Sequence, residues 1–269
     1  MRIALGQHES VRGDVEANLA RMERTVAEAK ADLVVFPELF LTGYSARDEH
    51  KRLAEALDGA SVGRVKDMAR VSGATVVFGM PERDALKSGM VYNSAVLVLP
   101  DGQALSYRKW SPANFGPFEE KVLFAEGQQL PVFDTPVGRM GLFICYDTFF
   151  PEIHKALSLQ GADLLVGISA GPFTSKAFFE AVLPARAIEN GSVVVFCNLV
   201  GTQLQFPFYG GSQIIGSRGE LVVKGPYFQD AIVVGEVDLK EVELTRLHRP
   251  TLKDTRKEAF DFIEDLFEE

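Results

Sequence analysis

Cysteine is scarce in this sequence, which has only Cys145 and Cys197 among its 269 residues. Both lie in apolar, strand-like stretches, so we do not expect a disulfide framework, and a reducing, cytoplasmic location fits. Long hydrophobic runs are also missing, because no stretch approaches the roughly 18 apolar residues that a membrane-spanning helix needs. The apolar run at the N-terminus is short and interrupted by Gly6, Gln7 and His8, which argues against a signal peptide.

An excess of positive charge is absent as well. The chain has 28 Lys and Arg against 37 Asp and Glu, which gives a formal net charge of -9. Nucleic acids and anionic membranes are bound through clustered basic residues, so the composition argues against both partners. What is present, 46% hydrophobic and 24% charged residues, is typical of a soluble globular protein with a sizeable core.

The segment 139–152, RMGLFICYDTFFPE, organises the functional interpretation. Its apolar half predicts a buried strand that ends on Cys145. We expect Asp147 or Thr148 to cap a helix that follows, with Pro151 in its first turn. A cysteine at such a turn lies where backbone N–H groups converge and can hold a thiolate or an oxyanion. Considered alone, a buried core cysteine is the commoner explanation, and Cys197 fits that explanation.

Periodicity along the chain predicts an α/β protein. A strand over 2–8, a helix from Asp14 to about 31 and a strand over 32–36 form an expected crossover unit. The Pro100-Asp101-Gly102 turn joins two expected strands and predicts antiparallel pairing, so the sheet should be mixed. Further strands are expected at 74–80, 90–99, 103–109, 132–133, 163–169, 193–198, 213–215, 221–223 and 232–237, and helices within 47–72 (broken near 59–63), 150–160 and 173–190.

Three reactive side chains lie at expected strand ends: Glu38, Lys109 and Cys145. Each alone is better explained as a solvated charge or a core thiol. Together they form a chemically complete set. An adjacent Lys109 ammonium is expected to lower the thiol pKa and to stabilise an oxyanion. Glu38 is placed to take the thiol proton and later to activate water.

These three segments resemble the nitrilase, or carbon–nitrogen hydrolase, superfamily. The matching stretches are VVFPELFLTGY around Glu38, YRK at Lys109 and GLFICYDTFFPE around Cys145. GADLLVGIS, ARAIENG, CNLVG and GGSQIIGSRGEL follow in the same order, so the resemblance spans residues 2 to about 239. It implies a four-layer αββα sandwich with mixed sheets, here over 1–250, that assembles as a homodimer or higher homo-oligomer and needs no metal or other cofactor.

The resemblance also implies roles for individual residues. Glu38 would be the general base, Lys109 the oxyanion-stabilising cation and Cys145 the nucleophile. A second glutamate often follows the lysine, and FGPFEEKVLF assigns it to Glu120 rather than Glu119. The implied reaction is attack on an amide carbonyl, loss of ammonia or an amine, and hydrolysis of a thioester.

Substrate preference is indicated by the residues around these motifs. Nitrile-hydrolysing members usually follow the cysteine with Trp-Glu, whereas this chain has Tyr146-Asp147, so we expect a small-molecule amide. Many members also carry a histidine shortly after the lysine, where this chain has Trp110. Mostly aromatic candidates suit a small apolar or aromatic amide; they are Tyr44, Phe115, Tyr146, Phe149, Phe150, Ser169 and Phe173. Nitrile, N-carbamoyl and ω-amide hydrolysis remain alternatives.

Two other classes of function stay open. In a cysteine–histidine hydrolase His154 would be the base, although a surface histidine on the following helix is the simpler interpretation. The chain could also be a non-catalytic interaction protein on the same scaffold. In the tail, 251–269, Phe260, Ile263 and Phe267 fall near helical spacing, and we expect them to dock on a partner subunit.

Overall fold

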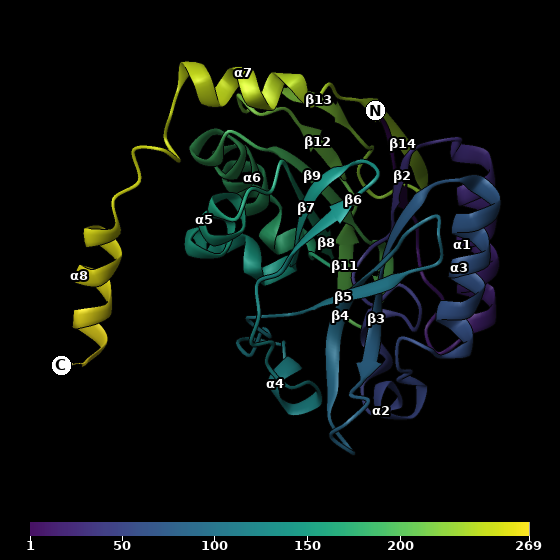
Figure 1. Ribbon diagram of the computed structural model, residues 1–269. Coiled ribbons are helices and arrows are strands. Elements are labelled where there is room, and N and C mark those ends of the chain that lie inside the picture. The colour runs from purple at the N-terminus through teal and green to yellow at the C-terminus, as the bar shows by residue number, and fades with distance from the viewer. Residues whose placement is uncertain (269) are drawn as a thin grey trace.

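Two six-stranded sheets form the centre of the protein, in a computed structural model that describes residues 1–268 (Figure 1). The first sheet has the order β14 (Ala231–Glu236), β1 (Arg2–Gln7), β2 (Leu33–Val35), β3 (Thr75–Arg83), β4 (Val91–Val98) and β5 (Ala104–Arg108). The second has the order β13 (Leu221–Lys224), β12 (Gln213–Ile215), β9 (Val193–Asn198), β8 (Leu164–Ser169), β7 (Gly138–Ile144) and β6 (Val132–Thr135).

Both sheets are mixed, as predicted. In the first, β1, β2 and β3 pair in parallel and the flanking strands pair antiparallel. In the second, β7, β8 and β9 form the parallel centre. The carboxyl ends of parallel strands lie at one edge of a sheet, which is where loops bring functional side chains together.

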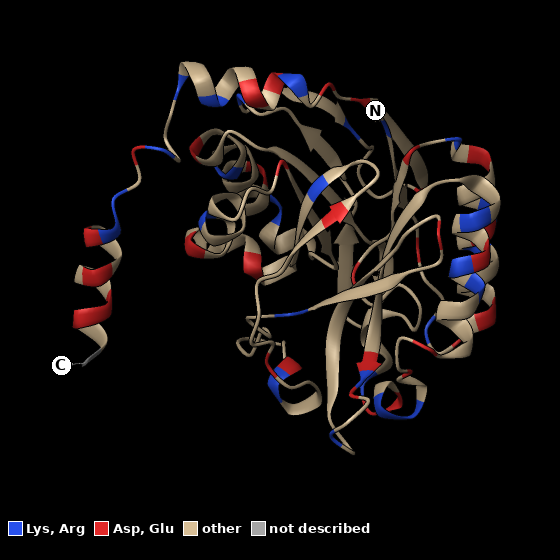
Figure 2. Cartoon of the chain, in the orientation of Figure 1, with Lys and Arg blue, Asp and Glu red and all other residues tan. Residues whose placement is uncertain are grey.

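Helices cover the two outer faces of this pair of sheets. α1 (Val15–Ala29) and α3 (Ala60–Ser72) pack on the first sheet, and α5 (Pro151–Leu159) and α6 (Lys176–Asn190) pack on the second (Figure 1). One apolar layer lies between the sheets and one lies under each helix pair. Charged residues gather on helices and loops, and the strands are largely uncharged (Figure 2). The predicted four-layer αββα sandwich is confirmed.

Local signals explain several helix boundaries. The Asp14 side chain accepts a hydrogen bond from the Ala17 N–H at 3.0 Å and caps α1, as this sequence predicts. α6 contains Pro184 and ends at Gly191, whose φ of 54° suits a glycine at a helix end. The predicted helical region 47–72 divides into α2 (Glu49–Leu53) and α3, so the break precedes its predicted place.

The turn after Cys145 differs from the prediction. Neither Asp147 nor Thr148 caps α5, because both lie within a 3₁₀ helix, η2 (Cys145–Phe149). The Asp147 carboxylate instead accepts hydrogen bonds from the Ile144 N–H at 3.0 Å and from the Tyr107 hydroxyl at 2.7 Å. α5 begins with Pro151, which needs no N–H partner at the first helical position.

Other elements were not predicted from the sequence. They are the hairpin of β10 (Val200–Gln203) and β11 (Phe206–Tyr209), helix α7 (Lys240–His248), and the short helices η1 (Tyr44–Ala46) and α4 (Glu120–Leu123). The helix predicted over 173–190 begins as a 3₁₀ helix, η3 (Phe173–Ser175), and continues as α6. The final helix, α8 (Lys257–Glu268), stands away from the sandwich and exposes Phe260, Ile263 and Phe267 (Figure 1). No helix within residues 1–268 has the length and apolar character to cross a membrane.

Candidate active site

Cys145 follows directly on strand β7 and has a φ of 47°. A left-handed conformation is strained for a residue with a side chain, and such strain persists only where the surroundings impose it. Here the Asp147 carboxylate holds the preceding Ile144 N–H, and it also accepts a hydrogen bond from the Ser111 N–H at 2.9 Å. Asp147 therefore connects the turn at Cys145 to the loop after Lys109 through hydrogen bonds.

Lys109 is fully buried between two carboxylates. Its Nζ donates to Glu38 Oε1 at 2.7 Å and lies 2.9 and 2.7 Å from the two oxygens of Glu120. Burial alone would lower the pKa of Lys109, but the negative charges of Glu120 and Glu38 outweigh it and hold the pKa well above its usual value. The side chain is therefore a fixed ammonium group inside the protein.

Both oxygens of Glu38 are held in place. Oε1 also accepts from Asn93 Nδ2 at 2.8 Å, and Oε2 accepts from the Ala170 N–H at 2.8 Å. Asn93 lies on β4 and Ala170 directly follows β8, so each of the two sheets contributes a partner. The carboxylate is thus oriented before any ligand binds.

Glu120, and not Glu119, joins this group. Glu120 is buried and accepts hydrogen bonds from the Tyr44 hydroxyl at 2.7 Å and from the Ala113 N–H at 3.1 Å, whereas Glu119 is exposed. Burial raises the pKa of Glu120, and Lys109 partly offsets this effect. The Lys109 ammonium therefore contacts both Glu38 and Glu120, and Tyr44 joins this group through Glu120.

The Cys145 thiol does not have the lowered pKa that its cationic neighbour predicts. Burial raises the pKa well above its usual value and the charge of Glu38 adds to this rise, while Lys109 acts in the opposite direction. Ser169, at the end of β8, also acts to lower this pKa. Lys109 thus acts to lower the thiol pKa, as predicted, but burial and the charges of the two carboxylates outweigh it.

Most of the aromatic candidates form one group around Tyr146. Its ring centroid lies 4.8 Å from that of Phe115, 5.1 Å from Phe150 and 6.1 Å from Phe149. Phe173 is separate from this group, since it is half-exposed and lies 5.5 Å from Phe228. The aromatic group around Tyr146 thus comes from η2, from Phe150 directly before α5 and from the long loop before α4.

The unpredicted hairpin packs two aromatic rings near Tyr44. The rings of Phe206 and Phe208 lie 6.2 and 5.7 Å from the Tyr44 ring. A small cavity of about 50 Å³ is lined by Tyr44, Phe206, Phe118 and Glu120 among others. No turn signal between 200 and 209 is strong enough to separate β10 from β11, so these residues were not predicted.

His154 does not lie where a catalytic base is needed. It is buried on α5, its ring is 4.7 Å from that of Phe143, and Nδ1 is 3.1 Å from the Phe150 carbonyl oxygen. Burial lowers the pKa of His154 to about 3. The interpretation as a surface histidine is wrong, because this imidazole is a neutral core group under the second sheet.

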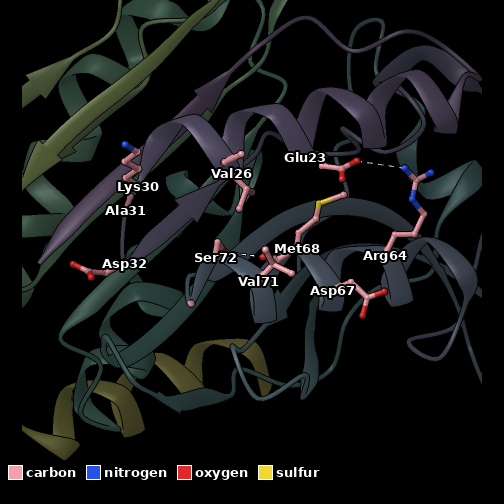
Figure 3. A pocket seen from close by; sticks show the side chains of 12 residues that line it. Glu23, Val26, Lys30, Ala31, Asp32, Arg64, Asp67, Met68, Val71 and Ser72 are labelled. Atoms are coloured by element: carbon pink, nitrogen blue, oxygen red, sulfur yellow. Dashed lines mark hydrogen bonds and ion pairs between the residues drawn. The ribbon is translucent and has the colours of Figure 1, made fainter.

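A surface groove lies apart from this site. A groove of about 750 Å³ runs between α1 and α3, with Val26, Met68 and Val71 in its apolar part and Arg64 paired with Glu23 at its rim (Figure 3). It lies on the outer helical layer, apart from the cysteine. Among residues 1–268, no group of three or more His, Cys, Asp or Glu side chains is arranged to hold a metal ion.

Comparisons with known proteins agree on one family. The family model for carbon-nitrogen hydrolases matches residues 2–247. The chain is 32% identical to a nitrilase from Pyrococcus abyssi, over 91% of this chain and 93% of that protein, and 32% identical to an (R)-stereoselective amidase from a Pseudomonas species, over 95% and 92%. Among solved structures, a mutant amidase from Nesterenkonia sp., with the acetamide moiety of fluoroacetamide added covalently at its active-site cysteine, matches with a TM-score of 0.80 and 29% identity, over 97% and 95%.

Proposed function

Because this chain belongs to the carbon-nitrogen hydrolase family, we propose that it is an amidase that cleaves a non-peptide amide through a cysteine thioester. The observation that carries the proposal is the buried Lys109 ammonium, held between Glu38 and Glu120 within electrostatic range of the Cys145 thiol. Burying a cation and two carboxylates costs folding free energy unless they pair closely. Such an arrangement at a strained cysteine is typical of a site that performs chemistry.

The reaction begins with proton transfer, because the raised pKa keeps Cys145 a thiol near neutral pH. As the sulfur attacks the amide carbonyl carbon, Glu38 takes the thiol proton. The Lys109 ammonium and the backbone N–H of Tyr146 stabilise the oxyanion. The carbon–nitrogen bond then breaks, protonated Glu38 gives its proton to the leaving nitrogen, and ammonia or an amine departs.

Hydrolysis of the thioester completes the cycle. Water attacks the acyl carbon while Glu38 accepts its proton, and the carboxylic acid and the Cys145 thiol are released. Glu120 keeps Lys109 in position and orients the substrate or the water, with Tyr44 fixing one of its oxygens. Ser169, whose buried hydroxyl has no hydrogen-bond partner within the described chain, would bind the substrate.

The substrate class is a small apolar or aromatic amide. Tyr146, which follows the nucleophile in the chain, forms an aromatic surface with Phe115, Phe149 and Phe150, and Phe173 lies outside this group beside Phe228. The chain is as similar to a nitrilase as to an amidase, so the choice of an amide rests on Tyr146-Asp147 after the cysteine, where nitrile-hydrolysing members usually have Trp-Glu. Nitrile, N-carbamoyl and ω-amide hydrolysis are the competing specificities.

An ammonia-release screen tests this proposal. Purified protein is assayed with aliphatic amides, aromatic amides, ω-amides, N-carbamoyl compounds and nitriles, and the Cys145→Ala variant serves as the blank. We expect the highest kcat/KM with small aliphatic or aromatic amides. Faster turnover of nitriles or of dicarboxylate monoamides would assign the protein to a different substrate class. No ammonia release from any compound would favour a non-catalytic interaction protein.

Assembly and location complete the proposal. The exposed apolar residues of α8, which include Phe260, Ile263 and Phe267, suit docking on a second copy of this chain. The tail, 251–269, would then belong to a homodimer or larger homo-oligomer built by the domain 1–250. The two unpaired cysteines suit a reducing cytoplasm.

A further inference from the structure

Tyr209 carries a buried polar group that the reaction described above does not use. Its side chain is fully buried, yet within the described chain its hydroxyl has no hydrogen-bond partner. Buried polar groups are nearly always paired in folded proteins, so an unpaired one calls for an explanation. A group of this kind near a nucleophile is explained most simply by a ligand that supplies the missing partner.

The position of Tyr209 connects it with Cys145. It is the last residue of β11, in the unpredicted hairpin, and the chain turns away immediately at Gly210 and Gly211, whose φ values are 67° and 62°. Its ring lies 6.5 Å from that of Phe179, in the apolar cluster against which Cys145 packs. The Phe179 ring in turn lies 5.0 Å from that of Phe149, so Tyr209 and the aromatic group around Tyr146 are neighbours of the same ring.

The charge around Tyr209 limits what it can bind. Burial raises the pKa of Tyr209, and the charges of Cys145 and Glu180 raise it further, so the phenol stays an O–H donor. The ammonium groups of Lys176 and Lys224 pair with Glu180. An incoming anion would therefore meet a carboxylate whose lysine partners are already engaged, and a neutral acceptor suits this place better.

We propose that the Tyr209 hydroxyl donates a hydrogen bond to a neutral oxygen in the acyl part of the substrate, an ether, hydroxyl or carbonyl oxygen a few atoms from the scissile amide. This inference rests on the proposed amidase function and adds a polar requirement to its apolar pocket. A site that hydrogen-bonds a substrate group discriminates against analogues that lack it, because its own buried group is then left unpaired.

A matched pair of substrates tests the inference. Butyramide and methoxyacetamide differ by the exchange of one methylene group for an ether oxygen. We expect Tyr209→Phe to lower kcat/KM for methoxyacetamide by about tenfold and to leave butyramide nearly unchanged, since one hydrogen bond is at stake. Each substrate is compared with itself in the two enzymes, so the inductive effect of the ether on amide reactivity cancels.

The control variant is Tyr227→Phe. Tyr227 is partly exposed and its hydroxyl donates to Glu180, so its removal should leave the ratio of the two substrates unchanged. Equal loss for both substrates in Tyr209→Phe would mean a role at the reacting carbonyl or in folding, and no loss for either would mean that water satisfies the hydroxyl. Both results overturn the inference. A larger loss of kcat/KM for succinamic acid than for methoxyacetamide would also overturn it, because succinamic acid carries a carboxylate.

Failure of the proposed function gives a different pattern. If the wild-type protein releases no ammonia from either amide above the Cys145→Ala blank, the amidase proposal fails and this inference fails with it. If the wild-type protein turns over both amides but the ratio does not change in Tyr209→Phe, only the role of Tyr209 is rejected.

Discussion

The two cysteines of this protein differ in their surroundings, although both belong to the region of the second sheet. Cys197 is within β9, in extended conformation opposite Ile168, and is fully buried. Cys145 lies just beyond the end of β7, with a φ of 47° and some exposure, among the charges of Glu38 and Lys109. Burial raises the pKa of both thiols. The comparison shows that the turn after a strand and the charges it meets, and not the thiol pKa, distinguish a candidate nucleophile from a core residue.

The strongest test of this comparison replaces each cysteine in turn. Cys145→Ala should lower kcat by roughly 10⁴-fold or more, as expected for loss of a covalent nucleophile. Cys197→Ala should keep activity within about twofold and lower the free energy of unfolding by about 1 kcal/mol, because it removes one buried sulfur. Ammonia release and denaturant unfolding measure the two effects. Comparable activity losses in both variants would break the comparison.

The base is the next part of the Cys145 environment to test. Glu38→Gln should lower kcat by about 10²- to 10⁴-fold, because the amide cannot accept the thiol proton. Lys109 still has Glu120 as a partner in this variant, so the protein should remain folded. Exposed Glu119 provides the matched control, and Glu119→Gln should keep wild-type kcat. Activity in Glu38→Gln close to that of the control would reject Glu38 as the base.

His154 provides a third test, which asks whether a buried histidine is a core residue and not a catalytic base. His154→Gln should leave kcat nearly intact, since the imidazole packs on Phe143 rather than near the thiol. In the wild type, the unfolded chain binds a proton at this histidine below pH 6.5 that the folded protein does not bind until about pH 3. This group therefore makes the free energy of unfolding fall with decreasing pH by about 1.4 kcal/mol per unit in that window.

The measurement for this prediction is urea unfolding at several pH values between 6.5 and 4. The His154→Gln variant should lose stability less steeply than the wild type as the pH falls. Parallel curves for the two proteins would show that the histidine is solvated when folded. A large loss of kcat would instead revive a cysteine–histidine hydrolase.

The smallest effect on activity is expected from the tail. Truncation after Pro250 removes α8, which stands apart from the sandwich and from Cys145 (Figure 1). We expect kcat within about twofold of the full chain, because no side chain of the site is lost. The mass in solution, measured by light scattering, should fall to that of a smaller assembly. An unchanged assembly would reject docking of α8 on a second copy.

Most of the fold could be predicted because its signals are local. Asp14 caps α1, Gly191 ends α6, and continuous apolar runs mark strands that are buried on both faces. The turn after Cys145 could not be predicted in the same way, since Asp147 bonds to residues of β5 and its following loop that only the folded chain brings near. Propensity favours a cap at an aspartate, but tertiary contacts decided otherwise.

In the site, too, some features could be predicted from the sequence and others depend on the folded structure. Motifs were sufficient to select Glu38, Lys109, Glu120 and Cys145, and the structure brings their side chains to one place. The direction of the Cys145 pKa was missed, because it depends on the balance between one cation, two carboxylates and desolvation. Tyr209 was missed because its importance lies in an unpaired hydroxyl, which leaves no pattern in the sequence.

Labelling with iodoacetamide near neutral pH, followed by peptide mass spectrometry, tests most directly whether Cys145 is the reactive thiol. The rate of alkylation reports how accessible and how activated each thiol is. The account predicts an adduct on Cys145 and an unmodified Cys197. Modification of Cys197 at an equal rate, or an unmodified Cys145 in a protein that still hydrolyses amides, would contradict it.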